Sequence, residues 1–145
     1  MVYEKEPPIC RFSVEVELAN DEDVVRAKLG QISSAQVRSE RIRGLVGSGA
    51  TRLVIPEAVA TRLGLEMTGS VQVRYADGRT ALRSIAGQIH LSYGGRDSVF
   101  NAVVEPERQS VLIGAIVLED LDFLVDCINQ RLVPRDPKQI VSEAE

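Results

Sequence analysis

Few side chains in this sequence are suited to chemistry at neutral pH. The 145 residues contain one histidine, His90, and two cysteines, Cys10 and Cys127, at opposite ends of the chain. His90 lies in an alternating apolar and polar run, so we interpret it as a strand-surface residue rather than a catalytic base. One histidine and two distant cysteines form no recognisable metal-ligand set, and we expect neither a metal nor another cofactor. A disulfide is geometrically allowed, but the reducing cytosol that we expect argues against it.

A loop of small residues is more informative. The segment Gly47-Ser48-Gly49-Ala50-Thr51 lies between two apolar runs, Gly44-Leu45-Val46 and Leu53-Val54-Ile55. Such runs are typical of buried strands. The pattern therefore predicts a tight connection between two core strands. Taken alone, it is also typical of an ordinary turn in a β-barrel.

The composition describes an ordinary globular domain. Hydrophobic residues make up 44% of the chain and charged residues 26%, with no tryptophan, so one domain with an aliphatic core is expected. The net charge of −4 disfavours nucleic-acid binding, and the arginines Arg38, Arg41 and Arg43 alternate as on the solvated face of a strand. No stretch approaches the ~20 apolar residues of a membrane span. The charged start, residues 1–8, does not resemble a signal peptide, so a cytoplasmic location is expected.

Many short strands and two short helices are predicted. Alternation or apolar character predicts strands over residues 12–18, 36–46, 53–55, 71–75, 80–85, 88–93, 98–104, 111–113, 123–126 and 131–134. The helices follow apolar strands, over 56–63 and 115–121. The acidic stretch 20–23 is expected to be a solvated turn, while 24–34 is ambiguous between a helix and a strand.

Two hairpins organise the middle of the chain. Ala76-Asp77-Gly78-Arg79 separates two alternating runs, which is a hairpin signal, and Gly94-Gly95 predicts a second turn. These elements predict a mostly β, barrel-like domain over 12–134, with an N-terminal extension over 1–11 and a polar tail over 135–145.

Together these motifs resemble the retropepsin-like aspartic proteases, and most closely the small bacterial members. The family pattern is two apolar residues followed by Asp, Ser or Thr, Gly and Ala, which Leu45 to Ala50 matches in all but one position. The second family motif, an apolar pair, a glycine and a helix, is matched by Leu112-Ile113-Gly114 and residues 115–121. The hairpin with its tip at 76–79 has the position of the family's flap. The resemblance covers roughly residues 12–134.

The resemblance implies a single-lobe closed barrel of short strands that forms a homodimer and binds a polypeptide. Each subunit would contribute one carboxylate, and the pair would share a proton and activate water. Ser48 would tie the two loops together, Gly49 would let the backbone approach the substrate, and Ala50 would leave the cleft open. Thr51, Arg52 and the flap residues Ala76, Asp77, Gly78 and Arg79 would line the cleft.

The sequence departs from the family at its central position. Residue 47 is glycine where the family has the catalytic aspartate, so a homodimer would have no carboxylate at either site. Glu57 begins a predicted helix, where an acid suits the dipole, and Asp77 belongs to a turn; neither is expected to substitute. The sequence therefore predicts an inactive chain. Gly47 marks either a natural pseudoprotease that binds peptides or dimerises, or an inactivated variant of an active protease. A β-barrel adaptor that only resembles the family is the third reading.

Overall fold

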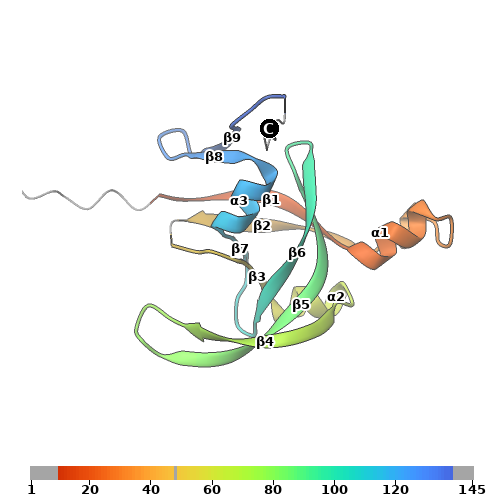
Figure 1. Ribbon diagram of the computed structural model, residues 1–145, viewed down its shortest axis with the longest axis horizontal. Helices are drawn as coiled ribbons and strands as arrows, with labels where there is room; N and C mark the ends of the chain where they lie inside the picture. Colours follow the sequence, from red (N-terminus) through yellow and green to blue (C-terminus); the bar gives the residue numbers. More distant parts are fainter. Residues whose placement is uncertain (1–9, 48, 139–145) are drawn as a thin grey trace, which may run out of the picture.

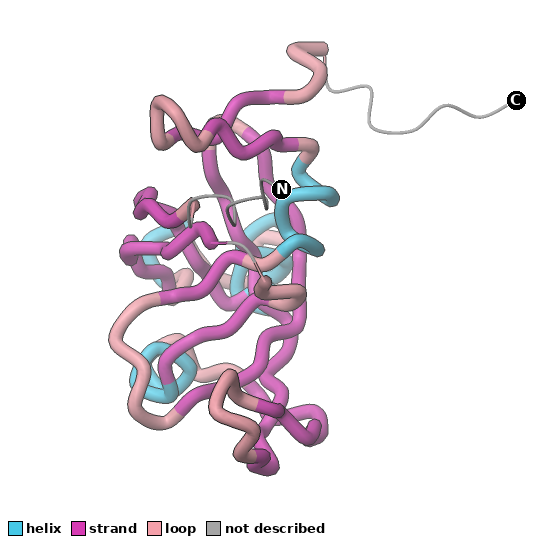
Figure 2. Tube along the Cα trace, turned by 90° about the vertical axis from the view of Figure 1, so that its left-hand side faces the viewer, coloured by secondary structure: helices cyan, strands magenta, loops and turns pink. Residues whose placement is uncertain are grey.

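The computed structural model describes residues 10–47 and 49–138 (Figure 1). Ser48, residues 1–9 of the predicted extension (1–11) and residues 139–145 of the predicted tail (135–145) lie outside the described residues. Strands make up most of the trace, with short helices between them (Figure 2). The strands are β1 (Arg11–Asn20), β2 (Ser39–Gly47), β3 (Leu53–Pro56), β4 (Glu66–Arg74), β5 (Thr80–Tyr93), β6 (Arg96–Glu105), β7 (Val111–Ile113), β8 (Phe123–Asp126) and β9 (Arg131–Pro134). The helices are α1 (Asp21–Lys28), the 3₁₀ turn η1 (Ser34–Gln36), α2 (Glu57–Arg62) and α3 (Ala115–Leu121).

Six of the described strands form a closed barrel. They pair in the order β1-β2-β7-β3-β6-β5, and β5 returns to β1 through pairs such as Leu18 with Leu91. β4 pairs with β5 alone among the described strands, so the β4–β5 hairpin extends from the barrel at the lower left of Figure 1. The prediction of a mostly β closed barrel is confirmed.

Alternation along the strands builds the core. In β1 the buried residues Phe12, Val16 and Leu18 face inward, while Glu15 and Glu17 are exposed. Burying side chains of this kind stabilises the fold by ~1.5–3 kcal/mol each. The two predicted helices close the barrel through buried apolar residues, Val59 and Leu63 at α2 and Val117 and Leu121 at α3.

The N-terminal half differs from the prediction at two places, and the structure also resolves the ambiguous segment. Residues 20–23 do not form a solvated turn: Asn20 caps α1 by accepting a hydrogen bond from the Asp23 amide, and Asp23 is buried. The ambiguous segment contains the rest of α1. β2 begins at Ser39 rather than at residue 36, because residues 34–36 form the 3₁₀ turn.

The predicted strands 80–85 and 88–93 are one strand, β5. A register shift between Ala86 and Ile89 against β6 accommodates the interruption in the alternating pattern. The hairpins turn at the predicted residues, although β4 begins at Glu66 rather than at residue 71. Gly94 and Gly95 both have positive φ, as a tight turn between β5 and β6 requires. β8 and β9 pair at the predicted residues.

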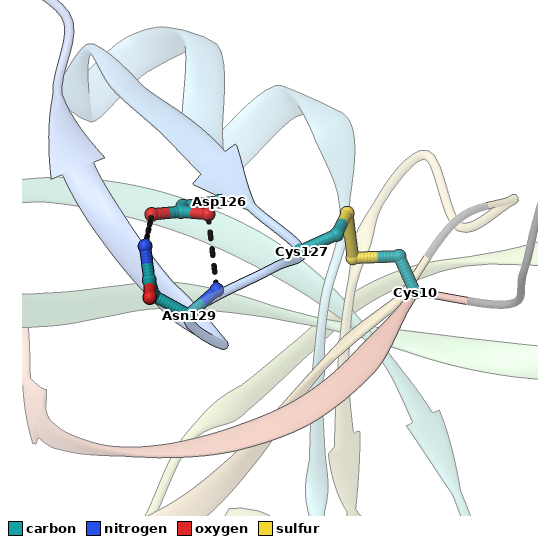
Figure 3. Close-up of a disulfide and its surroundings, with 4 residues drawn as sticks. All are labelled: Cys10, Asp126, Cys127 and Asn129. Atoms are coloured by element: carbon teal, nitrogen blue, oxygen red, sulfur yellow. Dashed lines mark hydrogen bonds between the residues drawn. A yellow bond between two sulfur atoms is a disulfide. The ribbon is translucent and has the colours of Figure 1, made fainter.

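A disulfide joins Cys10 to Cys127, with 5.5 Å between their Cα atoms (Figure 3). It attaches the start of β1 to the turn between β8 and β9, which the Asp126 carboxylate shapes by accepting hydrogen bonds from the Asn129 amide and side chain. The sequence-based argument against this disulfide was wrong. It rested on an assumed compartment, whereas the fold brings the two ends of the chain together.

A buried arginine anchors the β8–β9 sheet to the barrel. The Arg96 guanidinium donates to the carbonyl oxygens of Leu121, at 2.9 Å, and Asp122, at 3.0 Å. It also lies 5.3 Å from the centre of the Phe123 ring. No helix in the described ranges is both long enough and apolar enough to span a membrane.

Candidate functional site

The connection between β2 and β3, residues 47–52, is called the site loop below. β7 lies between these two strands: it runs parallel to β2, with Val46 opposite Ile113, and antiparallel to β3, with Val54 opposite Leu112. The two predicted motifs therefore meet in space. Because the loop connects strands on either side of β7, it must pass over the end of β7, where α3 begins.

The start of α3 holds the site loop. The Ala115 amide donates to the Ala50 carbonyl at 3.0 Å, and the Ile116 amide donates to the Thr51 carbonyl at 3.0 Å. The first amides of a helix have no partner within the helix, so the loop satisfies two of them. A Cβ atom on Gly114 would lie 2.4 Å from the Arg52 carbonyl oxygen. Glycine at 114 is therefore what allows this close approach.

The backbone conformation favours glycine at one of two glycine positions in the site loop and not at the other. Gly49 has a φ of +98°, a region that favours glycine. Gly47 ends β2 opposite Arg11 and does not have a positive φ. A Cβ atom on Gly47 would lie 3.5 Å from Cγ and 3.9 Å from Nε of Arg11, which are ordinary contacts. The fold therefore does not require glycine at residue 47.

A small cavity of about 280 Å³, called the loop cavity, lies beside the site loop. Loop residues, the disulfide and apolar side chains around α3 and β8 line it: Cys10, Val46, Gly47, Gly49, Ala50, Ala115, Leu118, Val125 and Cys127. Its described lining contains no aspartate or glutamate.

A larger cavity of about 840 Å³, called the hairpin cavity, lies between the β4–β5 hairpin and the barrel. Its lining combines apolar and charged side chains: Val54, Val73, Tyr75, Arg79, Thr80, Ala81, Arg83, Glu105, Pro106, Glu107, Arg108 and Leu112. Cavities of this size with apolar walls and a few converging polar groups are typical ligand sites.

A charged network crosses the hairpin cavity. The Tyr75 hydroxyl donates to both carboxylate oxygens of Glu105, at 2.9 and 2.7 Å, and accepts from Arg83 Nε at 2.8 Å. Arg83 also pairs with Glu105 at 2.9 Å. The hydrogen bond to Tyr75, aided by Glu105, raises the pKa of Arg83 above its usual value. The network thus fastens the hairpin to the end of β6.

The tip of the hairpin has ordinary turn chemistry. The Asp77 carboxylate accepts hydrogen bonds from the Arg79 amide at 2.9 Å and from Arg79 Nε at 2.7 Å. These bonds from Arg79 hold the pKa of Asp77 below its usual value. Gly78 has a φ of +88°, as the turn requires.

The predicted site residues are divided between the two cavities. Gly47, Gly49 and Ala50 line the loop cavity, and Leu112 and Arg79 line the hairpin cavity. Thr51, Arg52, Ala76, Asp77 and Gly78 are exposed and line neither, while Ile113 and Gly114 are buried behind the loop. The described structure therefore does not gather all of them in one pocket.

Several residues of the two cavities were not predicted. Tyr75, Ala81 and Arg83 line the hairpin side of the cavity, and the alternation along the flanking strands was a usable signal for them. Glu105 and Arg108 come from the other side of the cavity, and Arg11 comes from β1. Only the pairing of distant strands brings these three near the site, so no local pattern marked them.

Comparisons with known proteins agree with this geometry. The profile of the family described as aspartyl protease matches residues 25–125, which is more than half of the chain. The EIAV protease, solved in complex with the inhibitor HBY-793, is 15% identical with a TM-score of 0.55, over 92% of this chain and 99% of that one. A retropepsin-like aspartic protease from Rickettsia conorii is 12% identical with a TM-score of 0.45, over 86% and 91% of the two chains.

The search of curated protein sequences gave no match. At 15% identity, the EIAV protease supports the fold alone. The matched profile shows the family, because it covers more than half of the chain. This chain belongs to the aspartyl protease family, with a retropepsin-like fold.

Proposed function

We propose that this chain is a retropepsin-like aspartic endopeptidase domain that is inactive as written, because Gly47 occupies the position of the catalytic aspartate. One observation carries the proposal. The site loop has its supporting hydrogen bonds and its close contact with Gly114, and residue 47 has room for a side chain that the sequence does not supply. The loop geometry needs Gly49 and Gly114, whereas it does not need Gly47.

Peptide hydrolysis by this family needs two carboxylates that share one proton, so that one activates water while the other polarises the peptide carbonyl. No described acid replaces them. Glu57 is exposed at the start of α2, and Asp77 is exposed and held by Arg79 at the hairpin tip. The nearest charged side chain identified beside residue 47 is a cation, Arg11.

A homodimer built around the site loop is part of the proposal. Four large apolar side chains on α3, on β8 and in the turn after it are exposed: Ile116, Leu124, Val125 and Ile128, the last at 93%. Val125 also lines the loop cavity. An apolar surface beside the loop is suited to a second copy of the chain, because burying it removes apolar area from water.

The β4–β5 hairpin is the proposed flap, and the hairpin cavity beneath it is the proposed peptide cleft. An extended peptide could pair with strand edges while its side chains enter the cavity. The alternative role, a natural pseudoprotease that binds a peptide or dimerises, is favoured by this cavity. Its Tyr75–Glu105–Arg83 network and apolar walls need no carboxylate at residue 47.

Restoring the carboxylate tests the proposal. The Gly47→Asp variant should cleave peptides with an acid optimum and be inhibited by pepstatin, at a rate on the order of 10³-fold above that of the chain with Gly47. Gly47→Asn is the matched control, because it adds a side chain of the same size without the carboxylate. Sedimentation should show dimers of all three chains.

Each alternative has its own outcome. A folded, dimeric Gly47→Asp variant that cleaves nothing in a broad peptide library would favour the pseudoprotease. A chain that stays monomeric at high concentration, and binds no peptide, would instead support the adaptor reading. Equal cleavage by the Gly47→Asp and Gly47→Asn variants would contradict the role of residue 47.

The location of the protein is also a matter for proposal. The cytoplasmic prediction was a default, and the Cys10–Cys127 disulfide is of a kind that persists in oxidising compartments. We therefore propose that the protein folds in an oxidising compartment. The division into an extension, a domain and a tail at residues 12 and 134 stays a prediction.

A further inference from the structure

We propose that Arg108 selects an acidic side chain in a peptide bound in the hairpin cavity. This inference rests on the proposed function and names the chemistry that the same cleft would recognise. Arg108 lies in the connection between β6 and β7 and lines the cavity opposite the hairpin. It would therefore meet a ligand from the barrel side, while Tyr75 and Arg83 would meet it from the hairpin side.

The other two arginines that line the hairpin cavity form ion pairs, which leaves Arg108 available to a ligand. Arg83 pairs with Glu105 at 2.9 Å, and Arg79 pairs with Asp77 at 2.7 Å. Arg108 instead donates from Nε to the Ser110 carbonyl oxygen at 2.7 Å. No described carboxylate lies within 4 Å of its guanidinium, and Glu105 attracts it at longer range. A guanidinium has five N–H donors, so the two Nη groups retain donors for a ligand.

The environment of Arg108 favours a charged partner. The side chain is half-buried beside apolar wall residues such as Val54 and Leu112, and burial lowers the pKa of its guanidinium below the usual value. An arginine remains protonated under such conditions. Partial removal from water strengthens its attraction for a carboxylate, and the Ser110 carbonyl already orients the guanidinium.

The attraction for a ligand carboxylate arises from the residues that line the hairpin cavity and not from the net charge of the chain. The chain carries a net charge of −4, yet three arginines and two glutamates line the hairpin cavity. Of the two glutamates, Glu105 is engaged by Arg83 and Tyr75, and Glu107 is exposed, where solvent weakens its effect on a ligand. A carboxylate inside the cavity would therefore be attracted to Arg108.

Binding by the natural chain tests the inference without any catalysis. Labelled peptides with acetylated and amidated ends are prepared in pairs that differ only by Glu or Gln at one position, scanned along the peptide. Fluorescence anisotropy should show a preference for Glu of about tenfold in Kd at one register, as expected for a hydrogen-bonded charge pair. Arg108→Gln should abolish this preference, Arg108→Lys should retain part of it, and Arg108→Glu should favour Lys at the same register.

The matched control is Arg26→Gln, which removes the same charge from α1, on the opposite side of the barrel from the hairpin tip (Figure 1). It should keep the Glu preference. Peptides that bind with no difference between Glu and Gln overturn this inference and leave the proposed function standing. No binding by any peptide overturns both. A Glu preference that survives in folded Arg108→Gln, checked by circular dichroism, also overturns the role of Arg108.

Discussion

Two positions in this molecule could hold a partly buried carboxylate, and only one of them does. Asp23, in the first turn of α1, is 4% exposed and bonds to Arg38 through both carboxylate oxygens, at 2.8 and 3.0 Å. Residue 47 is a glycine in a loop that has room for a side chain. The first position has a charge that organises structure, and the second has space for a side chain but no side chain.

The surroundings of the two positions sharpen the difference. Around Asp23, Asn20 caps α1 and donates to the Leu63 carbonyl at 2.9 Å, so β1, α1 and the end of α2 are joined. Around Gly47, the loop is joined just as firmly to α3. Two described carbonyls of the site loop, those of Ala50 and Thr51, thus hold it to the start of α3. Residue 47 has space for a side chain, and we propose that this is the position at which the family has its carboxylate.

The largest effect on stability is expected from breaking the scaffold of the site loop. Gly114→Ala places a Cβ atom 2.4 Å from the Arg52 carbonyl oxygen, and backbone cannot yield as a side-chain tip can. We expect a loss of about 3 kcal/mol in the free energy of unfolding. Chemical denaturation measures this loss. Hydrogen exchange should also be faster at the Ala115 and Ile116 amides, which bond to the loop.

Two other glycines are matched controls for this change. In Gly44→Ala the new Cβ atom meets the end of the Ile113 side chain at 2.7 Å, which can move, so a loss of about 1 kcal/mol is expected. In Gly47→Ala only ordinary contacts with Arg11 form, and a change within about 0.5 kcal/mol is expected. Equal losses for Gly47→Ala and Gly114→Ala would contradict the claim that residue 47 tolerates a side chain.

A smaller effect on the free energy of unfolding is expected from removing the Asp23 carboxylate. The hydrogen bond from the Arg38 side chain is the main reason that the pKa of Asp23 falls from 3.8 to about 2. Asp23→Asn removes the charge and should cost about 2 kcal/mol at neutral pH. Because the folded-state pKa lies below the unfolded one, this contribution is fully present above pH 4 and is lost as the pH falls toward 2.

Denaturation of both chains between pH 7 and pH 2 measures this dependence. The difference in stability between the natural chain and Asp23→Asn should be largest at neutral pH and should shrink below pH 4. Arg26→Gln, in which a nearby exposed charge is removed without breaking a hydrogen bond to Asp23, should show a much smaller difference. If the difference in the free energy of unfolding between the two chains stays constant down to pH 2, the ionised carboxylate is not the stabilising group.

The sequence predicted elements better than it predicted what joins them. Local patterns were sufficient for β7 and α3, because an apolar run, a glycine and a helical segment follow one another at Val111 to Leu121. They failed at residues 20–23, where acidic residues were taken for a solvated turn. Asp23 is buried only because Arg38, 15 residues later, folds back to it, and local composition does not encode that pairing.

In the candidate site, too, local sequence patterns predicted one part, and the assembly of distant strands forms the other. The connection between β2 and β3 was predicted because small residues lie between two apolar runs, whereas its role as a site stays a prediction. The hairpin cavity was not foreseen as a charged cleft, since Tyr75, Glu105 and Arg108 meet only after β4, β5, β6 and β7 have assembled. The Cys10–Cys127 disulfide was rejected for a related reason: an argument about compartment outweighed a geometry that only the closed barrel reveals.

The smallest effect is expected from loosening the hairpin over the cavity. Tyr75→Phe removes the hydroxyl that bonds to Glu105 at 2.7 Å and accepts from Arg83 at 2.8 Å, but leaves the Arg83–Glu105 pair at 2.9 Å in place. A cost of about 1 kcal/mol is therefore expected. Since β4 pairs with β5 alone among the described strands, the loss should appear as faster amide exchange confined to β4 and the start of β5. The mutation leaves the site loop untouched, so Ala115 and Ile116 should exchange as in the natural chain. Faster exchange at those amides as well would show that the hairpin and the site loop open together, and that the cleft and residue 47 form a single cooperative unit.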